Sequence, residues 1–110
     1  MELYNYKAHI IKVYDGDTVT ALIDLGCNVK ITEKIRLADV DTPELRGEER
    51  ESGLISRDWL REKILDKDVL LHTNKDKKGK YGRYIGTIFL AGETVSINEQ
   101  IINEGLGKLY

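Results

Sequence analysis

The sequence has few of the features that mark secreted and membrane proteins. Its 110 residues include one cysteine, Cys27, which excludes an internal disulfide and fits a reducing compartment. No apolar run approaches the length of a transmembrane helix, so we expect no membrane association. The first ten residues, MELYNYKAHI, lack the basic start and apolar centre of a signal peptide. We therefore expect a cytoplasmic protein, or a secreted one if a leader has been removed.

An excess of positive charge is also missing. The 17 Lys and Arg residues are outnumbered by 19 Asp and Glu residues, which gives a formal net charge of −2. This balance excludes strong binding of nucleic acid through overall charge, so any polyanion binding must come from a local basic patch. The content of 41% hydrophobic and 33% charged residues predicts a folded chain. The length predicts one domain, residues 1–110.

Short runs of β-branched and aromatic residues, separated by turn signals such as Asp15-Gly16-Asp17, predict a mainly β fold. The predicted strands cover residues 4–14, 18–25, 29–38, 68–74 and 83–90. The third of them alternates through Val29, Ile31, Ile35 and Leu37. The polar residues 45–53 and the basic residues 75–80 are predicted to be loops.

Two helices complete the predicted fold. Residues 54–65 carry Ile55, Trp59, Leu60 and Ile64 at helical offsets. A capping box runs from Ser96 to Glu99 and predicts the start of a second helix, which Gly105 would end. The fold class is therefore mainly β (α+β), a five-stranded OB-fold barrel with two helices.

The segment RLADVDTPE, residues 36–44, combines one arginine with three acids at the end of a predicted strand, where Asp is disfavoured. Asp17 lies in a hairpin turn and Asp41 at this strand end, so the two carboxylates can converge on a hard cation such as calcium. Pro43 fixes the chain after Thr42 and can aim the Thr42 carbonyl at the same ion. Each piece taken alone is more often a solvated turn.

Two arginines belong to the same predicted barrel. Arg36 opens the acidic segment, and Arg83 ends the segment KYGR, residues 80–83. A guanidinium group matches phosphate with two parallel hydrogen bonds and stays charged at any working pH. One arginine alone is usually a surface ion pair, but two arginines with three acids at strand ends are harder to explain in that way.

These motifs resemble those of the staphylococcal nuclease (thermonuclease) family. The matching segments are DGDTV (15–19), RLADVDTPE (36–44) and KYGR (80–83), in the family's order and at near-family spacing. The segment NEQIINEGLGK (98–108) resembles the family's next helix. The resemblance covers nearly the whole chain, and the three motifs together are highly specific.

The resemblance implies an OB-fold barrel and calcium-dependent hydrolysis of phosphodiester bonds in single-stranded DNA and RNA, leaving 3′-phosphates. Asp17 and Asp41 match the family's calcium carboxylates, and Thr42 supplies a carbonyl ligand. Asp15 matches an acid close behind these ligands. Glu44 matches the glutamate that orients or deprotonates the attacking water.

The substrate contacts follow from the same resemblance. Arg36 and Arg83 match the two arginines that hold the phosphate. Lys80 and Tyr81 match positions that touch a terminal phosphate of the nucleotide, and Ile85 matches an apolar position near the base.

The sequence departs from the family pattern in three places. Asp39 stands where a small or apolar residue is usual, and the loop after Glu44 is shorter and more acidic. The chain also stops where the family continues into a final helix, which leaves Tyr110 as the candidate to flank a base. We therefore expect incompletely covered apolar residues and a possible weak homodimer through the C-terminal end. The residues concerned are Ile101, Ile102, Leu106 and Leu109.

The alternative function is a catalytically weak nucleic-acid-binding or protein-interaction OB module. Either alternative predicts that some of the arginines, aspartates and the glutamate of these motifs are replaced by other residues. None of these residues is replaced, which favours the nuclease.

Overall fold

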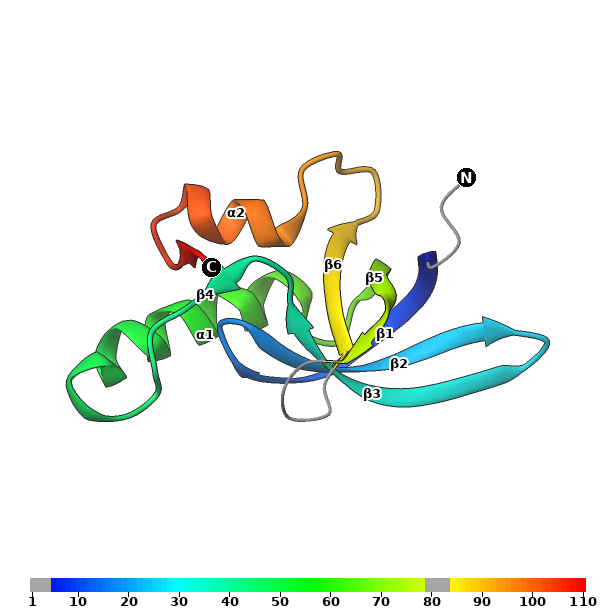
Figure 1. Ribbon diagram of the computed structural model, residues 1–110, viewed down its shortest axis with the longest axis horizontal. Coiled ribbons are helices and arrows are strands. Elements are labelled where there is room, and N and C mark those ends of the chain that lie inside the picture. Colours follow the sequence, from blue (N-terminus) through cyan, green and yellow to red (C-terminus); the bar gives the residue numbers. More distant parts are fainter. Residues whose placement is uncertain (1–4, 79–83) are drawn as a thin grey trace.

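A computed structural model describes residues 5–78 and 84–110, with the side chains of residues 74–78 left out of the description. Five strands close into a barrel, as the sequence predicts, and their order around the barrel is β1-β2-β3-β6-β5 (Figure 1). All neighbouring strands are antiparallel except β3 and β6, which are parallel. The five strands are β1 (Asn5–Asp15), β2 (Thr18–Gly26), β3 (Val29–Leu37), β5 (Asp68–Lys78) and β6 (Tyr84–Leu90).

Two helices and a second small sheet pack around one end of this barrel. A 3-10 turn, η1 (Gly47–Glu49), leads into α1 (Arg50–Ile64), and α2 (Ile97–Asn103) follows β6. The short strands β4 (Val40–Asp41) and β7 (Lys108–Leu109) pair antiparallel and join the chain's last residues to the segment after β3. None of the helices in the described residues has the length and apolarity needed to cross a bilayer.

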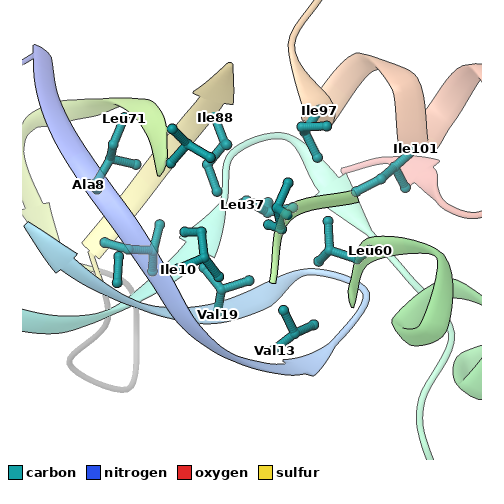
Figure 2. Packing of buried hydrophobic residues seen from close by; sticks show 14 of the residues in the cluster. Ala8, Ile10, Val13, Val19, Leu37, Leu60, Leu71, Ile88, Ile97 and Ile101 are labelled. Atoms are coloured by element: carbon teal, nitrogen blue, oxygen red, sulfur yellow. The ribbon is translucent and has the colours of Figure 1, made fainter. Parts of the chain in front are cut away.

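The core forms where the barrel strands and both helices meet. Figure 2 shows the barrel residues Ile10, Val19 and Leu37 in one cluster with side chains of the helices. Leu60 enters this cluster from α1, and Ile101 enters it from α2. Val40, in the segment that follows β3, belongs to the same core and ties this segment to the barrel.

The predicted capping box of the second helix is confirmed at its serine. The Ser96 hydroxyl oxygen accepts a 3.1 Å hydrogen bond from the backbone N–H of Glu99. Gly105 follows the helix with a φ of +74°, the left-handed conformation that ends helices.

Several boundaries and exposures differ from the prediction. Strand β5 continues through residues 75–78, which were predicted to be a loop, and Lys78 pairs with Tyr84 of β6 after an irregularity in the register. Helix α1 begins at Arg50 rather than at residue 54, and its Ile55 is 56% exposed while Ser56 takes the buried position. The polar, glycine-bearing start of α1 gives no apolar period by which a helix could be recognised.

Exposure also differs at the far hairpin and near the C-terminal end. Val29 and Ile31 lie on a β2–β3 hairpin that extends beyond the barrel, so both are exposed despite the alternating pattern (Figure 1). Ile101 is only 1% exposed, so the expectation that it is left uncovered is wrong. Ile102 and Leu106 pack partly against the core, whereas Leu109 is 76% exposed.

Candidate functional site

The turn between β1 and β2 holds the segment that follows β3. The backbone carbonyl of Asp17 accepts a 2.8 Å hydrogen bond from the N–H of Leu37. One carboxylate oxygen of Asp17 accepts a 3.2 Å hydrogen bond from the N–H of Thr42. Both Asp17 and Thr42 are buried at 8% exposure. The structure therefore brings together the two segments that the sequence predicts to converge.

The two aspartates of this turn lie against each other. The backbone N–H of Asp17 donates a 3.0 Å hydrogen bond to the Asp15 carboxylate, and the Thr18 hydroxyl donates to the Asp17 carboxylate at 3.2 Å. Burial, followed by the hydrogen bond and negative charge of Asp17, raises the pKa of Asp15 to about 6. A bound cation would offset the repulsion between these two carboxylates, so the pair favours cation binding.

Arg36 lies beside these aspartates on β3. Its Nη1 atom is 3.3 Å from a carboxylate oxygen of Asp17. The same nitrogen donates to the carbonyls of Val40 at 2.7 Å and Leu37 at 3.3 Å. The guanidinium carbon lies 5.3 Å from the centre of the Tyr110 ring. These contacts hold the Nη1 atom in place and thereby set the orientation of the whole guanidinium group.

The β4–β7 pair explains how Tyr110 reaches this position. Pairing of Val40 with Leu109 is followed by a 3.0 Å hydrogen bond from the Tyr110 N–H to the Asp39 carbonyl. Asp39 is exposed and has a φ of +61°, a left-handed conformation that Asp tolerates better than most residues. Its backbone conformation gives Asp39 a structural role that the sequence analysis left open.

Three glycines allow other elements to approach the segment 41–44 closely. A Cβ atom on Gly16 would lie 2.8 Å from Thr42 Cγ2, and one on Gly107 would lie 3.2 Å from the Asp41 carbonyl oxygen. A Cβ atom on Gly53 would lie 2.8 Å from the Glu44 carbonyl carbon. This segment is therefore enclosed by the β1–β2 turn, by α1 and by the residues before β7. The sequence analysis identified none of these three packing roles.

Beside this segment lies a groove of about 380 Å³. Asp41, Glu44 and Glu49 line it together with Ser52 and Lys108. Asp41 and Glu44 are exposed, and the Glu44 N–H donates a 3.2 Å hydrogen bond to the Glu49 carboxylate. The acidic side chains of the site therefore form two groups. Asp15 and Asp17 lie at the β1–β2 turn, whereas Asp41, Glu44 and Glu49 line this open groove.

The donor atoms are of the type that a hard cation prefers, but the described side chains do not form a metal-binding cluster. Over residues 5–78 and 84–110, no group of three or more Asp, Glu, His or Cys side chains lies close enough together to hold a metal ion. Asp17, Asp41 and the Thr42 carbonyl offer only oxygen, the donor that calcium prefers, and calcium sites commonly include water. The crowded Asp15–Asp17 pair supports the same choice.

The remaining predicted residues are only partly described. Ile85 is half-buried on β6 and is the direct partner of Arg36 across the parallel β3–β6 pair. Lys80, Tyr81 and Arg83 lie outside the described residues.

The chain is similar to a known protein family and to individual proteins. The family described as staphylococcal nuclease homologue matches residues 34–110. A micrococcal nuclease of Shigella flexneri is 25% identical over 96% of this chain and 59% of its own length. A thermonuclease of Staphylococcus hyicus is 28% identical over 90% of this chain and 56% of its own. An uncharacterized protein of Methanocaldococcus jannaschii is 27% identical over 96% of this chain and 60% of its own. The chain thus spans little more than half the length of these relatives.

Proposed function

Since this chain belongs to the staphylococcal nuclease homologue family, we propose that it is a calcium-dependent nuclease. It hydrolyses phosphodiester bonds of DNA and RNA, prefers single strands and leaves 3′-phosphates. Nuclease names among the relatives support the reaction class.

The orientation of Arg36 is the observation that carries the proposal. Within the described residues, its hydrogen bonds and its ion pair with Asp17 all use Nη1. The Nη2 and Nε atoms form the other edge of the fork, and this edge can donate two parallel hydrogen bonds to a phosphate. A phosphate held there lies next to the aspartate pair, where a calcium ion would also be attracted.

Asp17, Asp41 and the Thr42 carbonyl are the groups that would hold calcium, with Asp15 behind them. When bound, the ion supplies positive charge that offsets the extra negative charge of a five-coordinate phosphorus transition state. Glu44 borders the open groove, where it can orient and deprotonate an attacking water. Arg36, held in place by its contacts with Asp17 and Val40, stabilises the same negative charge, and Arg83 is assigned the same role. Lys80, Tyr81 and Ile85 bind the nucleotide beside the scissile bond.

The decisive experiment is digestion of a labelled single-stranded oligonucleotide in calcium, in magnesium and in chelator. We expect cleavage in calcium, much less in magnesium because magnesium demands strict octahedral geometry, and none in chelator. Equal cleavage in calcium and chelator would refute calcium dependence. A protein that binds the oligonucleotide but leaves it intact in calcium would instead be the catalytically weak binding module.

Variants at Arg36 and Glu44 test the assigned roles in the same assay. Arg36→Lys should lower turnover on the order of 10²-fold, because an ammonium cannot replace the two-pronged guanidinium. Glu44→Gln should slow cleavage and leave calcium affinity nearly unchanged. Loss of calcium binding in Glu44→Gln would make Glu44 a ligand. Arg57→Lys, at an ion pair on the helix surface, is the matched control.

Cytoplasmic location and the weak homodimer stay predictions. Leu109 and Tyr110 are 76% and 83% exposed, as contact through this end would require.

A further inference from the structure

Two rows of side chains cross the outer face of strands β1, β2 and β3. The pairing register sets Lys12 opposite Thr20, and Thr20 opposite Lys34. The next row places Thr18 opposite Arg36. Lys34 and Arg36 are two residues apart on one strand, so they project from the same face roughly 6.6 Å apart. The first row therefore continues directly from the site.

A single aromatic ring gathers the two lysines of the first row. The ammonium groups of Lys12 and Lys34 lie 5.4 Å and 4.8 Å from the centre of the Tyr14 ring. The Thr20 hydroxyl donates a 3.1 Å hydrogen bond to the Tyr14 oxygen. This hydrogen bond, with added effect from the two ammonium charges, lowers the pKa of Tyr14. The ring is thus anchored by the sheet, and it holds two like charges near each other.

Neither lysine is neutralised by an acid. Throughout the part of the chain whose side chains are described, Lys12 and Lys34 form no ion pair with a carboxylate. Another row of the same sheet differs in composition, because its register places an acid, Asp24, between Lys7 and Lys30, although no ion pair joins these three residues in the described part of the chain. In the row next to Arg36, a neutral threonine takes the place of that aspartate. Two close cations without an acid favour an anionic ligand.

The surroundings of Arg36 give this ligand a direction. The groove beside the segment 41–44 is lined by the carboxylates of Asp41, Glu44 and Glu49, which repel any phosphate whose charge no bound cation offsets. Lys34 is two residues from Arg36 on β3, and Lys12 and the Tyr14 ring lie next to Lys34. A single strand with one phosphate at Arg36 gains most by continuing over the lysines, where neighbouring phosphates meet positive charge.

We propose that Lys12, Tyr14 and Lys34 form a phosphate-binding subsite for the nucleotides flanking the scissile bond of a single-stranded nucleic acid. The subsite rests on the proposed nuclease function and adds to it the direction in which the bound nucleic acid leaves Arg36. It would supply the local basic patch that a chain with a net charge of −2 needs in order to bind a polyanion.

The test is binding of a fluorescent ten-nucleotide single-stranded DNA, measured by anisotropy in chelator over a range of salt concentrations. The variant is Lys12→Gln with Lys34→Gln, and the matched control is Lys7→Gln with Lys30→Gln. Each phosphate contact to a single strand contributes about 0.7 to the salt slope, so the variant should lose about 1.4. Its affinity deficit should then shrink about sevenfold between 50 and 200 mM salt. Restoring charge with Lys12→Arg and Lys34→Arg should restore the slope.

Control binding should stay close to wild type. The subsite is refuted if wild type does not bind, if both double variants bind like wild type, or if both lose affinity equally. Loss of binding to phosphatidylserine vesicles alone would assign the lysines to lipid and also refute it. Cleavage is scored separately: a protein with lysine-dependent binding but no cleavage retains the subsite and loses the nuclease function. A protein that cleaves without any lysine dependence loses only the subsite.

Discussion

Replacing Gly53 by alanine should separate catalysis from stability. The new Cβ would lie 2.8 Å from the Glu44 carbonyl carbon and 2.9 Å from the Pro43 carbonyl oxygen, with the Glu44 oxygen closer still. Ordinary contact begins at 3.4 Å and the Glu44 oxygen is the nearest of these atoms, so the two backbones must separate by more than the 0.6 Å that would relieve the contact with the carbon alone. Helix α1 is anchored by Leu60 in the core and by Arg61, which donates to the Val13 carbonyl at 3.1 Å. The loop carrying Glu44 is therefore the part that moves.

The expected magnitudes follow from two opposing effects. Overpacking costs about 1–3 kcal/mol, while alanine gains about 1 kcal/mol over glycine within a helix. The net loss of stability is about 0–2 kcal/mol, which lowers the melting temperature by at most about 8 °C. Displacing a catalytic group by about 1 Å can lower turnover about 10²-fold. The variant should therefore stay folded and become a poor enzyme.

Calorimetry and calcium-dependent oligonucleotide cleavage measure the two effects on the same protein samples. Glu62→Ala, at an exposed position of α1, changes helix propensity without touching the loop and serves as the control. Wild-type turnover in Gly53→Ala would show that the position of Glu44 does not matter for the reaction. If the activity of Gly53→Ala fell only in proportion to its unfolded fraction, the substitution would act through stability alone, contrary to this prediction.

Two further predictions concern pH and the buried amide. The folded-state pKa of Asp15, about 6, exceeds its ordinary value of 3.8, so the folded protein binds this proton more tightly. In chelator, the melting temperature of wild type relative to Asp15→Asn should therefore fall as the pH rises from about 4 to 6, and a constant difference would refute this. Asn98 accepts from the Ile88 N–H and donates to the carbonyls of Ala38 and Gly86. Asn98→Ala should cost about 3 kcal/mol, or roughly 10 °C, whereas exposed Asn103→Ala should change little; equal melting of the two variants would contradict that role.

Strands with clear turn signals were predictable almost to the residue. The Asp15-Gly16-Asp17 turn and the glycine at position 26 delimit β1 and β2 as observed. The end of β5 was missed because the charged run at 75–78 has low strand propensity, and the pairing of Lys78 with Tyr84 of β6 is a tertiary contact that local sequence does not reveal. Strands β4 and β7 are two residues long each, so no periodicity can reveal them.

The site was predictable where local sequence determines it. The contact between Asp17 and Thr42 follows from a tight turn and a strand end that meet at the barrel rim. The position of Tyr110 over Arg36 depends on pairing between β4 and β7, a tertiary contact. The row that contains Lys12 and Lys34 could not be recognised from the sequence. The two lysines are far apart along the chain, and only the pairing of three strands brings them together.

The parallel seam of the barrel also has a consequence for folding. Strands β3 and β6 meet through the described pairs Ile35–Tyr84, Arg36–Ile85 and Leu37–Gly86, which close the barrel between distant parts of the chain. Contacts between distant residues form late, because a long loop must be ordered first. Arg36 therefore acquires its neighbour Ile85 only when the barrel closes. A brief local opening of this short seam would separate Arg36 from Ile85 while the β1–β2–β3 meander stays folded, so the proposed nuclease activity would depend on a seam of three described residue pairs.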